Sequence, residues 1–115
     1  PEEGARQAQR VVALVLQFGE RNPGLVRVMV GDALVREHER LQARMNQFFD
    51  RIESNLRQCL RPAAGAAGSA TPSVDAQVAA SVLTAFLQGR LQRFARSGLR
   101  RLPTEHLEAS LALML

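Results

Sequence analysis

The sequence predicts an all-α domain of about five helices. Apolar residues recur at intervals of three, four and seven residues over long stretches, and no segment alternates apolar and polar residues with the two-residue period of a strand. Proline and glycine divide these stretches at a few points, as helix boundaries require. With 115 residues, of which 46% are hydrophobic and 23% charged, the chain has the size and composition of one globular domain. We therefore expect residues 1–115 to form a single helical domain.

The first helix is expected over residues 2–22, because Pro23 disfavours a helical conformation in the residue before it. One face of its helical wheel is apolar and is predicted to be buried: Val12, Val15, Leu16 and Gly19. The opposite face is polar around a single leucine: Arg10, Leu14, Gln17 and Arg21. This second face is either a small contact surface for an extended peptide or a polar surface on which Leu14 packs under its neighbours. Periodicity alone favours neither interpretation.

Two further helices are expected over residues 25–30 and 33–61, the latter capped by Asp32. The longer helix has one buried stripe: Leu34, Leu41, Met45, Phe48, Ile52, Leu56 and Cys59. The segment that follows, 62–73, contains mainly small residues with two prolines and two glycines. It is predicted to be a flexible loop.

A fourth helix is expected over residues 74–99, with Thr71, Ser73 or Asp75 as its cap and with a main apolar stripe of Val78, Val82, Phe86 and Phe94. Small residues at Ala79, Ala80 and Gly89 would let another helix approach closely. A fifth helix after Pro103 is expected to bury Leu107, Leu111 and Met114. These last two long helices have more apolar surface than one small core needs, which predicts a homodimer built as a four-helix bundle. The expected interface residues are Val82, Phe86, Phe94, Leu107 and Leu111.

Catalysis and metal binding are not expected. The candidate groups are His38, His106 and Cys59, and on one helix His38 and Cys59 would lie about 31 Å apart. No zinc-type spacing of Cys and His and no phosphate-binding glycine pattern occurs. No cofactor is implied either. A single cysteine, and the lack of a basic, apolar leader or of an apolar run of ~20 residues, predict a cytoplasmic protein.

All fifteen basic residues are arginines, and the formal charge is +4. Arginine favours phosphate and carboxylate ligands, although a GC-rich genome would also explain the bias. One ladder, Arg36, Arg40 and Arg44, lies early in the third helix. A second cluster crowds the end of the fourth helix: Arg90, Arg93, Arg96, Arg100 and Arg101. Solvated arginines at a helix end are the simpler interpretation, and contact with nucleic acid is the alternative.

Several short segments of the sequence resemble those of one known family. They are FGERNPGL at 18–25, the segment 41–48, Arg51-Ile52-Glu53 and the residues 55–58, followed later by Phe94, Arg96, Ser97 and Pro103-Thr104. Together they resemble the nucleoid occlusion factors of the SlmA type, which are TetR-like regulators. The likeness covers most of the chain except the alanine-rich segment.

The resemblance implies a dimerising regulatory domain that follows a DNA-reading helix-turn-helix domain. Both ends of the chain look like cuts through a longer protein, so DNA would be bound only through the part that this chain lacks. In this family the regulatory domain also contacts the C-terminal tail of the division protein FtsZ. The positions that carry over are Leu14, Gln17, Arg21 and Asn22. Gln17 stands where the family can have glycine, and the helix joining the two domains would form the other wall of the contact groove.

The alternative is the ligand-sensing domain of an ordinary TetR-like repressor. In that case an internal pocket for an apolar molecule would be lined by Leu16, Phe18, Met29, Met45 and Phe48.

Overall fold

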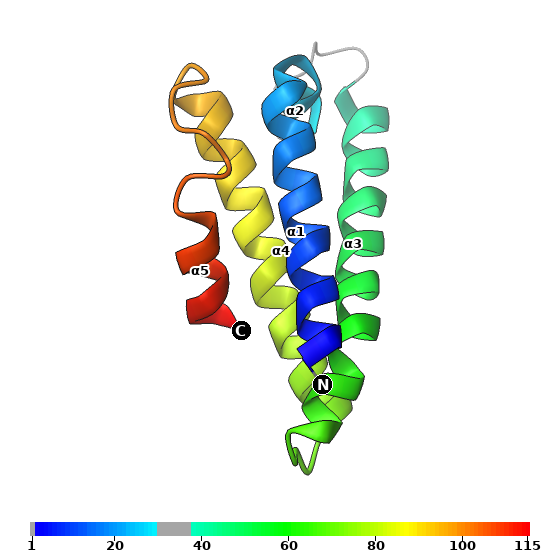
Figure 1. Ribbon diagram of the computed structural model, residues 1–115. Helices are drawn as coiled ribbons and strands as arrows, with labels where there is room; N and C mark the ends of the chain where they lie inside the picture. The colour runs from blue at the N-terminus through cyan, green and yellow to red at the C-terminus, as the bar shows by residue number, and fades with distance from the viewer. Residues whose placement is uncertain (1, 30–37) are drawn as a thin grey trace.

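The computed structural model describes residues 2–29 and 38–115 and contains five α-helices and no strand within these ranges (Figure 1). The all-α prediction is confirmed. The helices are α1 (Glu2–Arg21), α2 (Pro23–Met29), α3 (His38–Ala66), α4 (Pro72–Arg96) and α5 (Leu107–Met114). The expected cap Asp32 and the expected first turn of the third helix lie outside the described residues.

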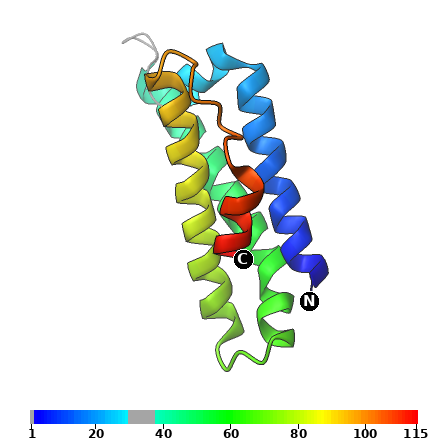
Figure 2. The same ribbon diagram turned by 60° about the vertical axis from the view of Figure 1, so that its left-hand side comes forward.

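Three long helices, α1, α3 and α4, run side by side along a bundle that measures 48 × 28 × 15 Å (Figures 1 and 2). At one end α1 and α4 finish, α3 begins and α2 lies across the bundle. We call this the α2 end. At the opposite end, α3 and α4 are joined by a short connection close to the start of α1 (Figure 1). The last helix, α5, packs against α4.

The buried face of α1 is the face that the helical wheel predicts, because Val12, Val15, Leu16 and Gly19 are all buried. The predicted stripe of α4 is right for its two phenylalanines and wrong for its two valines. Phe94 is buried and Phe86 is half-buried, but Val78 and Val82 are exposed, and the helix also buries Ala76, Ala80, Leu83, Leu87 and Leu91. Two of these positions are alanines, whose small side chains let a neighbouring helix pack closely against α4.

The predicted loop 62–73 is mostly helical. α3 continues through Pro62 to Ala66, and α4 begins at Pro72. The helix ends at Gly68, whose φ of 88° is a left-handed conformation that glycine adopts at little cost. The amides of Gly68 and Ser69 donate to the carbonyls of Gly65 and Ala64, both at 3.1 Å, which is the Schellman arrangement at a helix end. The alanines around Pro62 favour helix strongly enough to extend α3 by one turn.

The same arrangement ends α4. Gly98 has a φ of 67°, and the amide of Leu99 donates to the carbonyl of Phe94 at 2.9 Å. At its start, Thr71 is the capping residue but makes no side-chain cap bond; its hydroxyl and that of Ser69 both donate to the Asp75 carboxylate. The fifth helix was expected to be long, and this expectation is wrong because α5 spans only eight residues.

Two glycines let α1 pack closely on its neighbours. A Cβ atom on Gly4 would lie 2.3 Å from the carbonyl oxygen of Cys59 in α3, and one on Gly19 would lie 2.5 Å from Cδ2 of Leu91 in α4. At Gly89, by contrast, a Cβ atom would have no neighbour within 4 Å. Gly4 and Gly19 therefore fix how closely α1 lies against α3 and α4.

Candidate partner-binding site

The polar stripe predicted on α1 is exposed. Leu14 is 64% exposed, and Arg10, Gln17 and Arg21 are also exposed. Within the part of the chain that the structure describes, Leu14 does not pack under its neighbours. Leu14 is therefore accessible to another molecule.

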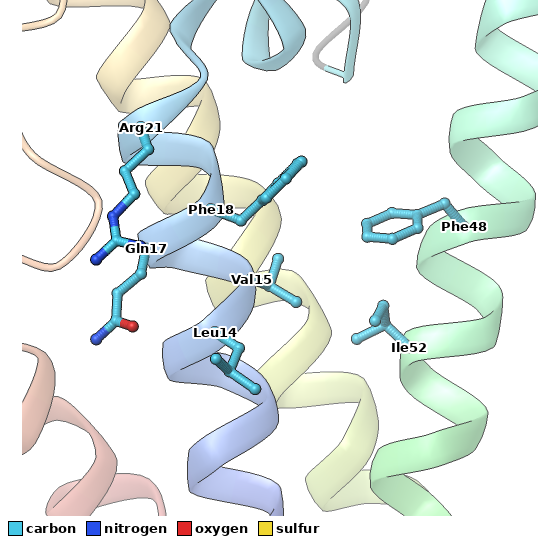
Figure 3. Close-up of a pocket in the computed structure, with 7 residues that line it drawn as sticks. All are labelled: Leu14, Val15, Gln17, Phe18, Arg21, Phe48 and Ile52. Carbon is cyan, nitrogen blue, oxygen red and sulfur yellow. The ribbon is translucent and has the colours of Figure 1, made fainter.

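An apolar groove of about 480 Å³ lies between α1 and α3 (Figure 3). Its lining residues are Leu14, Val15, Gln17, Phe18, Arg21, Phe48 and Ile52. The side chains of Phe18 and Phe48 point toward each other across it, as Figure 3 shows. Phe48 is supported from behind by the buried Phe49, with ring centroids 5.3 Å apart and the rings inclined at 72°. Such an edge-to-face contact holds the wall of the groove in place.

Gln17 and Arg21 project from α1 on the side away from α3 (Figure 3). They also line a second, more polar groove of about 610 Å³ between α1 and the α5 segment, together with Glu20, Thr104, His106, Leu107, Glu108 and Ala109. The hydroxyl of Thr104 donates to the Glu20 carboxylate at 3.1 Å, which ties this segment to α1. The predicted contact stripe is therefore the ridge between two grooves.

The tip of α1 is held by Asn22. Its side-chain amide donates to the carbonyl of Phe18 at 2.8 Å, and its own carbonyl accepts from the amides of Leu25 and Val26 at 3.0 and 3.2 Å. Asn22 is exposed but lines neither groove, so its visible task is to fix the turn from α1 into α2. Arg21, beside it, has no hydrogen bond or ion pair within residues 2–29 and 38–115 and is free to meet a ligand.

The sequence did not reveal the second wall of the apolar groove. The expected wall was a helix outside this chain, whereas here Phe48 and Ile52 of α3 supply one. Periodicity assigned both residues to the core, and only the positions of α1 and α3 show that they border an open groove. The residues proposed for an internal sensor pocket are dispersed: Leu16 is in the core, Phe18 and Phe48 border the groove, Met45 is half-buried, and the side chain of Met29 lies outside the described part.

The arginine cluster after α4 is organised around Glu105. Arg101 donates two hydrogen bonds to its carboxylate, at 2.9 and 2.8 Å, and Arg93 and His106 approach it at 3.9 and 3.8 Å. The hydrogen bonds from Arg101 are the main cause that lowers the pKa of Glu105 from its usual 4.5 to about 2. Arg90 donates to the backbone carbonyl of Glu105 and, at 3.1 Å, to the Ser110 hydroxyl. These contacts fix the link between α4 and α5 against α4.

The residues predicted for a dimer interface differ in exposure. Phe94 and Leu111 are buried in the chain's own core, Phe86 and Leu107 are half-buried, and Val82 is exposed. Val82 continues an exposed row with Val74 and Val78 on α4. The outward face of α4 is thus the part of the predicted interface that another copy could reach directly.

Within the described ranges, no group of three or more His, Cys, Asp and Glu residues is placed to hold a metal ion. Cys59 is a free thiol whose Sγ lies 3.6 Å from the side-chain oxygen of Asn55. None of the helices in the described part combines the length and apolar character that crossing a membrane demands.

The fold and the comparisons with known proteins agree. The model of the C-terminal domain of tetracycline-repressor-like proteins, in its SlmA-like form, matches residues 5–115. The chain belongs to this SlmA-like family, which is a family of regulators and not a class of enzymes.

Several curated relatives are named nucleoid occlusion factor SlmA. The chain is 45% identical to the nucleoid occlusion factor SlmA of Idiomarina loihiensis over 90% of this chain and 53% of that protein. For the SlmA proteins of Cronobacter sakazakii and Salmonella paratyphi B the identities are 47% and 48%, over 93% and 86% of this chain and 54% and 50% of the relatives. The chain spans about half the length of the curated relatives that it matches.

Proposed function

We propose that this chain is the dimerising, partner-binding domain of a nucleoid occlusion factor. In the full-length protein it would bind the C-terminal tail of FtsZ while a separate domain holds DNA, and so would inhibit assembly of the division ring in the cytoplasm, at the nucleoid. Its family membership and the SlmA name of its relatives support this assignment. The domain contributes binding and no catalysis.

The observation that carries the proposal is the pairing of an apolar groove with a free cation at its rim. Leu14, Phe18 and Phe48 offer apolar surface to the side chains of an extended peptide. Arg21 has no partner in the described part of the chain, and a guanidinium can bind a peptide carboxylate or its carbonyl groups. A tail that lies along α1 would therefore bury apolar side chains in the groove while its polar groups reach Arg21.

The dimer is proposed to form through α4 and α5. The exposed valines of α4, Val74, Val78 and Val82, leave an apolar face that a second copy can cover. Gly89 continues this face without a side chain, so two α4 helices can approach closely there. Self-association of one surface gives the symmetric pair that is commonest among oligomers.

The test is a titration of the full-length protein with a fluorescently labelled FtsZ tail peptide. We expect saturable binding at tens of micromolar or below, and a loss of that binding when Leu14 is replaced by Glu. If no saturable binding occurs, the assignment of this partner is wrong.

A ligand-sensing domain is the second candidate, because an apolar groove of this volume also fits a small apolar molecule. The exposure of Leu14 and Phe18 argues against it, since a sensor pocket normally encloses its ligand. Displacement of a bound apolar dye by the FtsZ tail peptide would show that the groove serves the peptide.

A further inference from the structure

We propose that the α2 end of the bundle is a sequence-independent binding surface for the phosphates of duplex DNA. Its cationic members, called here the α2-end arginines, come from four elements and the turn that follows α4. They are Arg21, Arg27, Arg40, Arg44, Arg93, Arg96, Arg100 and Arg101. Figures 1 and 2 show the end of α1, all of α2, the start of α3 and the end of α4 at this same end of the molecule.

The charge of the chain is concentrated at this end. Among the residues that the structure describes, this end holds eight arginines and three carboxylates, whereas the rest of the chain holds six of each. The excess of positive charge in the described part therefore lies at the α2 end, and the remainder of the bundle is formally neutral. A cluster of this kind creates a local positive potential that an even distribution of the same residues would not.

The side chains that the structure describes pair few of these cations. Six of the α2-end arginines are exposed and have no hydrogen bond or ion pair with any of those described side chains: Arg21, Arg27, Arg40, Arg44, Arg96 and Arg100. One carboxylate at this end, Glu105, is paired with Arg101, while Glu20 accepts a hydrogen bond from the Thr104 hydroxyl.

Arg93 adds a further unsatisfied donor. Its Nε and Nη2 atoms are buried and have no hydrogen-bond partner among the described residues, and its ion pair with Glu105 is long, at 3.9 Å. A buried donor without a partner is costly, so an anion that reached it would be bound favourably.

Duplex DNA matches this surface in charge and size. The duplex carries one negative charge per about 1.7 Å of its axis, and arginine binds phosphate with two parallel hydrogen bonds. An end face 28 Å across can oppose several phosphates at once. A single strand would need exposed aromatic rings for base stacking, and the exposed aromatic side chain among the described residues, Phe18, borders the peptide groove.

The choice of DNA as the polyanion rests on the proposed function, in which the full-length protein is held on DNA. The α2 end would then contribute affinity without contributing to sequence recognition, which belongs to the DNA-reading domain.

The experiment uses this chain and a labelled 30-base-pair duplex of scrambled sequence, with binding measured by fluorescence anisotropy at 50 and 200 mM salt. Two double variants of equal charge are compared after circular dichroism has shown that both are folded. The test variant is Arg96→Gln/Arg100→Gln. The matched control is Arg10→Gln/Arg51→Gln, in the middle of the bundle, where both arginines are exposed and unpaired in the described part.

We expect the test variant to lose at least tenfold in affinity at 50 mM salt, and its slope of log affinity against log salt to fall by about 1.8, or 0.9 per lost phosphate contact. The control variant should lose less than threefold. Equal losses in the two variants, or no measurable binding by the unmodified chain at 50 mM salt, would overturn the proposal. So would binding to vesicles that contain anionic phospholipid without binding to the duplex, since Leu25 and Leu102 are partly exposed apolar residues near this end. Peptide binding by the full-length protein is measured separately, so either proposal can fail alone.

Discussion

Two neighbouring residues of α1 should respond in opposite ways to the same substitution. Val15 is 8% exposed and Leu14 is 64% exposed, because they lie on different faces of the helix. Replacing each in turn with Glu introduces the same charge one position apart. The comparison therefore isolates the orientation of α1, on which the position of the site depends.

The structure sets the size of the two effects. Val15→Glu loses the burial of a valine, about 1.5–3 kcal/mol, and places a carboxylate at a position that is 8% exposed on the apolar side of α1, which adds ~2 kcal/mol. A total of about 3.5–5 kcal/mol approaches the whole stability of a small domain. Leu14→Glu loses only the buried third of one leucine, about 0.5–1 kcal/mol.

Urea denaturation followed by circular dichroism measures both variants, and the FtsZ tail peptide measures binding by the full-length protein. We expect Val15→Glu to be unfolded or nearly so at 25 °C. Leu14→Glu should keep its helicity and unfolding midpoint while it loses peptide binding. If both substitutions destabilised the domain equally, α1 would be packed with its other face inward, and the assignment of the contact stripe would be wrong.

Three further outcomes are expected. Gly19→Ala should lower the free energy of unfolding by about 1–2 kcal/mol, because its methyl group would meet Leu91, whereas Gly89→Ala should raise it by up to about 1 kcal/mol in the unassociated chain; urea denaturation compares them. Since the pKa of Glu105 is lowered from 4.5 to about 2, its stabilising contribution is complete above pH 4.5 and is lost as the pH falls toward 2. Glu105→Gln should therefore show a weaker loss of thermal stability over that interval, and an unchanged pH profile would contradict the assigned hydrogen bonds. Val82→Glu should shift the chain from dimer to monomer in sedimentation equilibrium at micromolar concentration without loss of helicity, and a monomeric unmodified chain would refute the proposed dimer.

The sequence predicted which segments are helical better than it predicted which face of each helix packs against the rest of the chain. The face that α1 buries follows from the 3.6-residue period, and that prediction is confirmed. In α4 the same reasoning placed Val78, Val82, Phe86 and Phe94 on one stripe. The two valines are exposed, whereas the buried positions include Ala76 and Ala80. A helix with two apolar faces gives no periodic signal that tells which face meets its own chain and which is left outside.

The alanine-rich segment shows a second limit. Pro62 predicts a helix end, but α3 continues to Ala66 and is terminated at Gly68, whose left-handed conformation favours glycine and allows the two hydrogen bonds that close the helix. Pro62 and Gly68 are both residues that can end a helix, and the sequence alone does not show which of the two ends α3.

The candidate site, too, could be predicted from the sequence only in part. Leu14, Gln17 and Arg21 could be placed on one exposed stripe from the sequence, but Phe48 could not be placed opposite them. That pairing depends on the alignment of α1 with α3, which is set by contacts far apart in the chain.

The most direct test of the account measures the affinity of the full-length protein for the labelled FtsZ tail peptide, with and without Arg21→Asp. The control is Arg100→Asp, which makes the same charge change at an exposed arginine of the α2 end that lines neither groove. We expect Arg21→Asp to weaken peptide binding at least tenfold, or ~1.4 kcal/mol, with an unfolding free energy within about 1 kcal/mol of the unmodified protein, and Arg100→Asp to weaken it less than threefold. Equal affinities in the unmodified protein and Arg21→Asp would contradict the placement of the partner on α1.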